Sequence, residues 1–357
     1  MTTHYSWRST LIIRVSIVCL WIVLIYFFLY MPRLINSIYT QKQITILTWP
    51  AFIDAQYVQK FEKETGIKVN IRYFDSNEEL YVKMKKTGGE GYDLIIPSDY
   101  ILDTLIQEDL LKKIDRTKLH FFDQLYPHLV GTYVDPHNDY SIPYWWGLWG
   151  MAFDKSFFGD KKMDESWALI FNKNGLGTHT ISLDDGRELI LIAAQYLFGN
   201  VDVLDEKQLE MIRTLLIDQK PWVEVYAEVD RANFLLASKI CPIGIMVDSI
   251  IARVMLEMPD IRFIMPKEGG FLQIDSFAIP KTTTHEKEIY QFLNFIYSVP
   301  AMQYHTSKFG FFSPVKNVQH ADCPIAFPTE EQIQKTRFFK NIISREQISD
   351  IWIALKS

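Results

Sequence analysis

The chain opens with a long apolar stretch that differs from everything after it. Residues 11–31 are almost continuously hydrophobic, interrupted by Arg14 and Ser16. A helix needs about 20 apolar residues to span the hydrocarbon core of a membrane. Arg8 and Arg14 lie at the start of the stretch, which favours an N-terminus on the cytoplasmic side. We therefore expect a membrane helix, followed by a short tether over 32–43 and an exported body.

The same stretch has a second interpretation as a cleaved signal peptide. Signal peptides have a shorter apolar core and a cleavage site flanked by small residues. Here the stretch ends in the bulky residues 27–31, no such site follows, and the residues before Cys19 match a lipoprotein box poorly. This pattern favours an uncleaved anchor. Either interpretation places residues 44–357 outside the cytoplasm.

In the body, the spacing of apolar positions switches between strand and helix periods. Residues 44–48 are an apolar run typical of a buried strand, and the alternation over 67–73 indicates a second strand. The residues between them have a helical period that ends at Gly66. A further helix, for which Asn77 is the expected cap, leads to a third strand at 93–97. This order predicts an α/β domain with a largely parallel sheet.

Two groups of residues come directly after strands of this sheet. Trp49 follows the first strand, and Ser98, Asp99 and Tyr100 follow the third. Ligands of parallel sheets bind beyond the carboxyl ends of the strands. We therefore expect both groups to face one crevice.

A second α/β region is predicted between about 148 and 273. It contains a strand at 181–183, a helix at 184–198 and a short strand at 244–247. The strand at 276–280 and the helix after it then indicate a return to the first domain. Two lobes joined by crossing strands place a cleft between them, which suits a ligand that closes a hinge.

Charge and motifs narrow the possible functions. The net charge is −6, and because residues 1–43 carry bases but no acids, the rest has 33 bases against 43 acids. An acidic body disfavours a nucleic-acid partner and is compatible with a cationic ligand. The sequence lacks Cys-x-x-Cys, His-Glu-x-x-His, Gly-x-Ser-x-Gly and phosphate-loop motifs, so we expect no enzyme, metal site or other cofactor. Cys241 and Cys323 are either a disulfide or two buried thiols.

Several segments resemble the polyamine-binding periplasmic proteins of ABC transporters. They are LTWPAFID with FEKETGIKVNIRYFDSNEELYVKMKK, then YDLIIPSDYILDTL, LLKKID, NDYSIPYWWG and PKEGGFLQIDSFAIP. The likeness is dense over 44–150, intermittent over 180–190 and 240–280, and thin near the C-terminus. Together these segments are specific to the superfamily and less specific for the ligand.

The resemblance implies a two-lobed α/β fold of the Venus-flytrap type. After an N-terminal membrane segment and tether at 1–43, the first lobe comprises 44–147 with 274–319, and the second 148–273 with 320–357. The implied protein is periplasmic and anchored to the inner membrane by its N-terminal segment. It captures spermidine or putrescine and delivers it to the permease and ATPase subunits of an importer. The alternative is a protein of the same fold that binds an amino acid derivative or an anion.

The resemblance also implies a site in which aromatic rings surround the ligand methylenes and acids hold its ammonium groups. The corresponding positions here are Trp49, Phe52, Ser98, Tyr100, Asp185, Glu188, Asp248, Asp275 and Phe311. Five positions depart from the family pattern: Phe52 and Phe311 replace tyrosines, Ile245 and Gln273 replace tryptophans, and Lys340 replaces a glutamine. The departures bear on which ligand is bound, because a weaker box and an added lysine disfavour a cation.

The physical chemistry of a polyamine matches this residue set. Spermidine carries about three positive charges near neutral pH, so burying it requires both methylene contact and charge neutralisation. Each aromatic face contributes roughly 0.5–2 kcal/mol of cation–π attraction. Each carboxylate contributes about 1.5–3 kcal/mol through charge-assisted hydrogen bonds.

Purely structural roles are open for the same residues. Asp185 and Glu188 are three apart at a helix start, which is also a capping arrangement. Ser98 is expected to cap its helix rather than to contact ligand. Asp248, expected as a ligand residue, has an alternative as the cap of the helix near Ser249. Trp49 has an alternative as core, Asp275 as an ordinary turn acid, and the aromatic residues 144–149 are expected mainly in the core or hinge.

Overall fold

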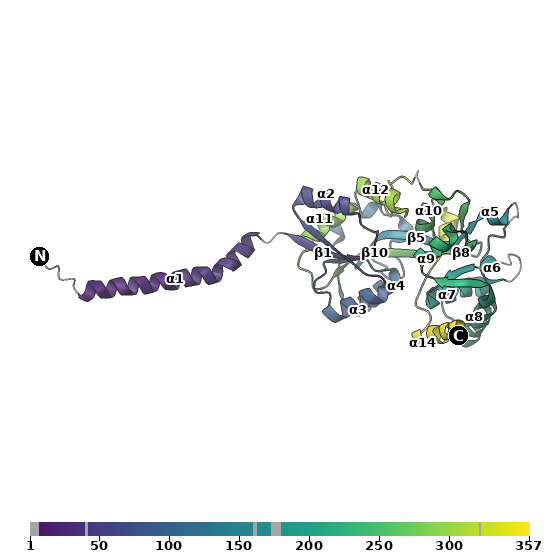
Figure 1. Ribbon diagram of the computed structural model, residues 1–357, viewed down its shortest axis with the longest axis horizontal. Helices are drawn as coiled ribbons and strands as arrows, with labels where there is room; N and C mark the ends of the chain where they lie inside the picture. The colour runs from purple at the N-terminus through teal and green to yellow at the C-terminus, as the bar shows by residue number, and fades with distance from the viewer. Residues whose placement is uncertain (1–6, 40–41, 160–162, 173–179, 321–322) are drawn as a thin grey trace.

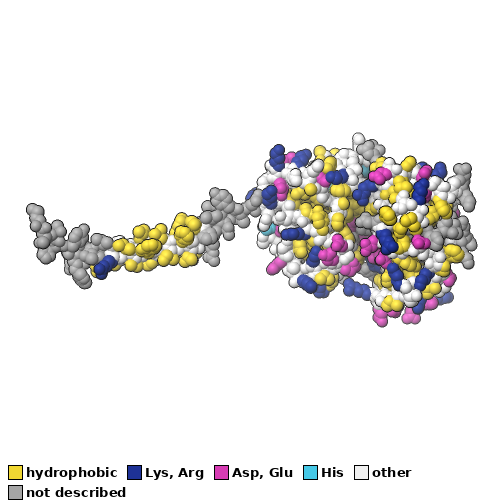
Figure 2. Space-filling model, viewed as in Figure 1, with side chains coloured by type: hydrophobic (Ala, Val, Ile, Leu, Met, Phe, Trp, Pro, Cys, Tyr) yellow, Lys and Arg dark blue, Asp and Glu magenta, His cyan; other side chains and the backbone are white. Residues whose placement is uncertain are grey.

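The computed structural model describes residues 7–39, 42–159, 163–172, 180–320 and 323–357. Helix α1 (Trp7–Tyr39) projects from a folded body (Figure 1). Its segment Arg14–Met31 is long and apolar enough to cross a membrane, and hydrophobic side chains line it (Figure 2). The helix continues to Tyr39 because residues 33–39 include no glycine or proline to end it. Most of the predicted tether is therefore helical.

The first part of the body is a parallel sheet with helices between its strands. It comprises β1 (Gln43–Thr48), α2 (Ala55–Thr65), β2 (Lys68–Tyr73), α3 (Asn77–Thr87), β3 (Leu94–Ile95) and α4 (Asp99–Gln107). Strand β1 pairs in parallel with both β2 and β3. Gly66 ends α2 in the left-handed conformation, with φ 73°. Ser76, not Asn77, caps α3, because its hydroxyl accepts the N–H of Glu79.

Two long antiparallel strands connect the two halves of the body. They are β5 (Ser141–Asp154), whose residues are all buried, and β10 (Phe271–Pro280). The pairing of β5 with β10 has an irregularity between Asp275 and Ser276. The strands form one sheet in the order β2-β1-β3-β10-β5-β8-β6-β7, to which β4 (Leu111–Lys112), β9 (Ile261–Ile264) and β11 (Arg337–Phe338) add at the sides.

The second half repeats the parallel arrangement, because β6 pairs in parallel with β7 and β8. Its elements are α5 (Lys155–Phe158), α6 (Ala168–Phe171), β6 (Thr180–Leu183), α7 (Gly186–Phe198), α8 (Glu206–Gln219), β7 (Val223–Ala227), α9 (Val229–Ala237), β8 (Ile243–Val247) and α10 (Asp248–Glu257). Below, the first lobe means β1–β3 with α2–α4, α11 (Glu286–Ile296) and α12 (Val299–Phe309), and the second lobe means β6–β8 with α7–α10. Figure 1 places these two sets of elements on either side of β5 and β10.

The C-terminal third contributes to both halves. It contains α11 (Glu286–Ile296), α12 (Val299–Phe309), α13 (Glu330–Lys335) and α14 (Arg345–Lys356). Helix α11 packs beside β1, whereas α14 packs against α7 and α8. Short 3-10 turns lie at 116–118, 122–124, 127–129 and 220–222. The residue limits of the lobes given above stay a prediction.

Candidate functional site

Two first-lobe strand ends and the crossing strand β10 meet at Asp275. Ser98, directly after the β3 strand segment, forms an isolated bridge with Asp275. Its hydroxyl donates to Asp275 Oδ1 at 2.5 Å, and the Gln273 side-chain amide donates to Asp275 Oδ2 at 3.3 Å. Asp275 is 1% exposed. Burial raises the pKa of its carboxyl to about 7, although the Ser98 hydrogen bond favours the ionised form. The described donors to this buried acid are neutral.

The predicted cap at Ser98 is wrong in one respect. Ser98 occupies the N-cap position of α4, but its side chain makes no capping hydrogen bond. Its hydroxyl instead donates to Asp275 and accepts from the Asn77 side-chain amide at 2.9 Å. The hydroxyl hydrogen is directed to a carboxylate, which is a strong acceptor, and the hydroxyl oxygen accepts from Asn77 in place of a helix N–H, so Ser98 serves the acid.

Trp49 lies beside this acid, as expected of a residue after β1. Its indole packs on Phe74, with ring centroids 4.4 Å apart, and lies close enough to Asp275 to lower the pKa of that carboxyl. The N–H at the buried Trp49 Nε1 favours the ionised carboxylate of Asp275, although it does not reach hydrogen-bond geometry with any acceptor in the described structure. The site therefore contains an aromatic face next to an uncompensated acid.

The second lobe supplies a pair of acids at the start of α7. Asp185 caps this helix, because its Oδ1 accepts the N–H of Glu188 at 2.9 Å. The capping interpretation therefore describes Asp185. The Glu188 carboxylate is only 15% exposed. Burial and the neighbouring Asp185 raise its pKa to about 8, while Arg187 opposes the rise and Asp275 adds to it. Asp275 and Glu188 are thus close enough to repel each other.

Arg187 was not expected at the site from the sequence, yet it lies at its centre. The side chain is 8% exposed. Its guanidinium stacks on the Tyr100 ring at 3.6 Å and pairs with Glu188 Oε1 at 3.5 Å. Burial opposes the charge, but Glu188, Tyr100, Asp185 and Asp99 outweigh it and raise the Arg187 pKa. The sequence feature that could have identified Arg187 is its place in the first turn of a helix, where the helix dipole disfavours a base.

Asp99 is a fourth acid at this site; the sequence placed it at the crevice but gave it no role in ligand binding. It is 5% exposed, and its Oδ2 is buried without a hydrogen-bond partner in the described structure. Burial raises its pKa to about 7, and Arg187 opposes the rise. Burial also raises the pKa of Tyr100. We call Asp99, Asp185, Glu188 and Asp275 the acid cluster.

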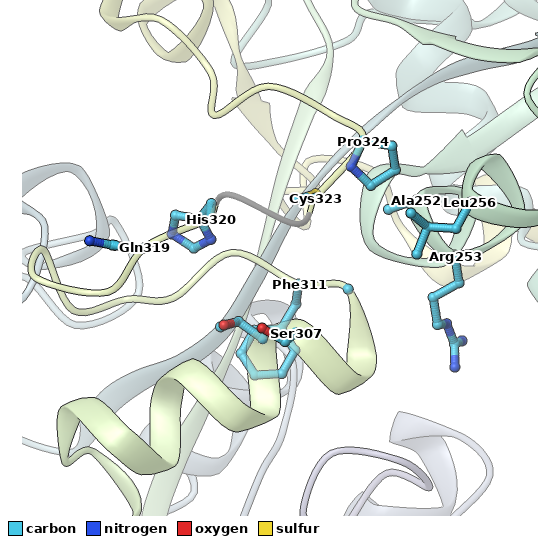
Figure 3. A pocket seen from close by; sticks show the side chains of 11 residues that line it. Ala252, Arg253, Leu256, Ser307, Phe311, Gln319, His320, Cys323 and Pro324 are labelled. Carbon is cyan, nitrogen blue, oxygen red and sulfur yellow. The ribbon is translucent and has the colours of Figure 1, made fainter.

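Three other predicted site residues lie in packed surroundings. Phe52 stacks on Trp145 with centroids 5.6 Å apart. Phe311 is 2% exposed, packs against Tyr144 and lines a pocket between α10, α12 and residues near Cys323 (Figure 3). Asp248 is 1% exposed.

The carboxylate of Asp248 accepts two backbone N–H groups, those of Leu148 at 2.9 Å and Ser249 at 2.6 Å. Val247, not Asp248, occupies the N-cap position of α10. Burial raises the pKa of Asp248 to about 7. Its described contacts join β5 to α10, and none of them is with the acid cluster.

The positions that depart from the family pattern fall into different environments. Ile245 is buried in β8. Gln273 lies between Trp149 and Asp275: its side-chain oxygen accepts from Trp149 Nε1 at 2.7 Å, and its amide donates to Asp275. Lys340 pairs with Asp202 at 3.0 Å at the edge of another pocket. Cys241 and Cys323 are free thiols, and no group of three metal-ligating side chains occurs among the described residues.

Comparison with known protein sequences identifies the family of this chain. Residues 56–334 match the family described as bacterial extracellular solute-binding protein. The chain is 31% identical over 248 residues to the spermidine/putrescine-binding periplasmic protein of Escherichia coli K12, covering 70% of each chain. It is 29% identical over 339 residues to the putrescine-binding periplasmic protein SpuD of Pseudomonas aeruginosa, covering 88% of this chain and 92% of SpuD.

Solved structures confirm the fold. The spermidine/putrescine ABC transporter substrate-binding protein PotD of Streptococcus pneumoniae superposes with a TM-score of 0.78 at 24% identity, over 88% of this chain and 98% of that one. The TpPotD lipoprotein of Treponema pallidum gives 0.78 at 23% identity, over 88% and 99%. These likenesses confirm the predicted two-lobed α/β architecture of periplasmic binding proteins. The chain belongs to the bacterial extracellular solute-binding protein family, whose members are non-enzymatic components of transport.

Proposed function

We propose that this protein captures a polyamine, spermidine or putrescine, between its lobes and delivers it to the permease of an ABC importer. The acid cluster is the observation that carries the proposal. It gathers four carboxyl groups from both lobes and β10, with one guanidinium, that of Arg187, among them in the described structure. Ionisation of all four leaves an excess of negative charge in a buried place, which a cationic ligand neutralises.

The aromatic surfaces fit the same ligand. Trp49 lies at Asp275 and Tyr100 lies at the other acids. Both rings are half-buried, with Trp49 packed on Phe74 and Tyr100 stacked with Arg187, and the parts they leave exposed suit methylene groups between the charged ends. The names of the relatives from Escherichia coli and Pseudomonas aeruginosa support a polyamine. With α1 as a membrane anchor, the body would work on the periplasmic side of the inner membrane.

Calorimetry on the full chain in a non-ionic detergent tests the proposal. Putrescine and spermidine are expected to bind with one site per chain and with heat release. The neutral 1,4-butanediol, which has the carbon chain of putrescine without its charges, is the matched control and should not bind. Absence of binding by any linear diamine or triamine would refute the polyamine assignment.

Arg187 and Gln273 favour a second candidate, a ligand that carries a carboxylate as well as an amine. The guanidinium is a bidentate partner for carboxylates, and Gln273 adds an amide beside Asp275. A thermal-shift comparison of putrescine with 4-aminobutyrate, which differs by one terminal group, separates the two functions. A larger shift with the amino acid would favour the second.

A further inference from the structure

The side chain of Arg187 bridges elements that belong to different lobes. Its backbone lies in the first turn of α7 in the second lobe. Its guanidinium stacks on Tyr100, which lies in the first turn of α4 in the first lobe, at 3.6 Å. Asp99, the neighbour of Tyr100, is among the acids that raise the Arg187 pKa. One planar cation thus faces an aromatic ring and an acid of the opposite lobe.

A C-terminal strap, residues 338–341, joins the same contact. Arg187 Nη1 donates to the carbonyl oxygen of Phe339 at 2.7 Å. The Asn341 side-chain amide donates to the carbonyl oxygen of Tyr100 at 3.4 Å, and Phe338 packs on Tyr133 at 5.2 Å. The strap also pairs with β10 through Phe338. Arg187 therefore connects both lobes and the strap at one point.

Burial at the start of a helix is unfavourable for a positive charge, so the contacts of Arg187 must stabilise it there. Removing an ion from water costs several kcal/mol unless partners replace the hydration. The helix dipole adds to the cost at the first turn of α7. Nη2 makes no hydrogen bond in the described structure, although it lies 3.5 Å from Glu188 Oε1. The partners that offset the cost are therefore the acids, the Tyr100 ring and the Phe339 carbonyl. Two of them, the Tyr100 ring and Asp99, belong to the first lobe and are available only when the lobes are together.

We propose that Arg187 is a positioning residue that latches the closed form and so slows escape of the ligand. This inference rests on the proposed function, because it assigns a kinetic role at the same site. In an open form the guanidinium loses Tyr100 and Asp99 but keeps Glu188 and Asp185. The latch therefore acts whenever the lobes come together, and once a ligand is between them it slows their reopening.

The alternative role for Arg187 is plain repulsion of a cationic ligand, and it predicts the opposite sign. If Arg187 acted only through its charge, its removal would leave the acid cluster more negative and would tighten amine binding. If Arg187 is a latch, its removal weakens binding even though a like charge has gone. The two roles are separated by the direction of the change in koff.

Stopped-flow tryptophan fluorescence on the full chain in detergent measures kon and koff for spermidine and putrescine. Arg187→Gln is expected to raise koff at least tenfold for both amines while kon stays the same or rises, because the free site is more negative. An unchanged or lower koff with tighter binding would overturn the latch. Arg187→Lys keeps the charge but loses the planar stack, so a koff near that of Arg187→Gln supports the latch, and a koff near wild type contradicts it.

Substitutions on the first-lobe side test the latch independently, including the case in which Arg187→Gln fails to fold. Tyr100→Leu removes the stacking partner and is expected to raise koff; because Tyr100 also faces the proposed ligand, the double variant and the ligand-free exchange experiment decide between the two causes. Combining it with Arg187→Gln should add little, because both remove one contact, whereas additive effects would contradict the latch. Hydrogen exchange without ligand gives a second readout: amides at 99–102 and 187–190 should exchange faster in both variants than in wild type.

The outcomes for the two proposals differ. If wild type binds no amine in calorimetry, the proposed function fails and the kinetic role fails with it. If wild type binds an amine but neither Arg187→Gln nor Tyr100→Leu raises koff, only the latch is refuted.

Discussion

Replacing Asp275 by asparagine should weaken ligand binding and stabilise the ligand-free protein at the same time. Asp275 is buried, its described donors are the neutral groups of Ser98 and Gln273, and Asp99 adds electrostatic repulsion. Asparagine has nearly the same shape but no charge. The two effects have opposite signs because the charge is useful only when a cation is bound.

The loss of affinity follows from one charge-assisted hydrogen bond. Such a bond contributes about 1.5–3 kcal/mol, which corresponds to a roughly 10- to 150-fold increase in Kd. The gain in stability follows from linkage. Burial raises the Asp275 pKa from 3.8 to about 7, so its ionisation at pH 8 costs the folded state up to roughly 4 kcal/mol. The asparagine amide cannot accept from Gln273 as the carboxylate does, which reduces the gain to about 1–3 kcal/mol.

Thermal unfolding of the full chain at pH 8, with and without spermidine, measures both effects, and calorimetry gives Kd. The expected result is a higher Tm without ligand and a smaller ligand-induced shift. Asp54→Asn is the matched control. Asp54 is also buried, but it caps α2 and pairs with Lys308, so its loss should lower Tm and leave Kd unchanged. A lower Tm for Asp275→Asn together with an unchanged Kd would refute the reasoning.

Three more predictions follow from other contacts. Between pH 6.5 and 8 the ligand-free protein should lose stability as pH rises. The folded-state pKa values of Asp99, Asp248 and Asp275 (about 7) and of Glu188 (about 8) exceed their unfolded values, so the folded state binds more protons. Saturating spermidine should reduce this loss, and a flat profile of Tm against pH would contradict the prediction. Trp49→Ala should raise the Kd for putrescine by roughly 2- to 30-fold through loss of cation–π contact, measured by calorimetry, and an unchanged Kd would place Trp49 in the core alone. Gly269→Ala should destabilise the fold by at least about 1–3 kcal/mol, measured by chemical denaturation. The reason is that Gly269 has φ +97° and an added Cβ would lie 2.1 Å from the Lys335 carbonyl oxygen. Unaltered stability would show that the backbone shifts freely there.

Features that depend on local pattern were predictable from the sequence. Strand β1 and the helix ended by Gly66 follow from the apolar spacing and from the left-handed conformation that glycine tolerates. Trp49 and Ser98 were expected to face one crevice because both follow parallel strands, and the structure brings both to Asp275. The Asp185 cap was open to prediction because a cap involves residues three apart.

Features that depend on the meeting of distant segments were not predictable in this way. Ser98 has the position of a cap, and only the approach of β10 brings the Asp275 carboxylate to which its hydroxyl donates. Asp99 and Arg187 lie in different lobes, so their sequence positions give no sign that they share an electrostatic environment. Asp248 resembles a ligand acid in sequence, whereas its carboxylate accepts backbone N–H groups of β5 and α10.

Burying the ionised acid cluster destabilises the ligand-free protein, and this unfavourable free energy can be used by a binding protein. Three of its carboxyl groups have pKa values of about 7 to 8, so near neutral pH the ligand-free site is divided between protonated and ionised forms. If the ligand is the proposed amine, its entry favours the ionised form and releases protons, which couples capture to closure of the lobes around it. Arg187 offsets part of the negative charge before the ligand arrives, so the closed form is reachable without ligand but is completed only by a further positive charge. A second permanent base in the cluster would remove this dependence, and Gln273→Lys beside Asp275 should therefore raise the Tm of the ligand-free protein and abolish amine binding.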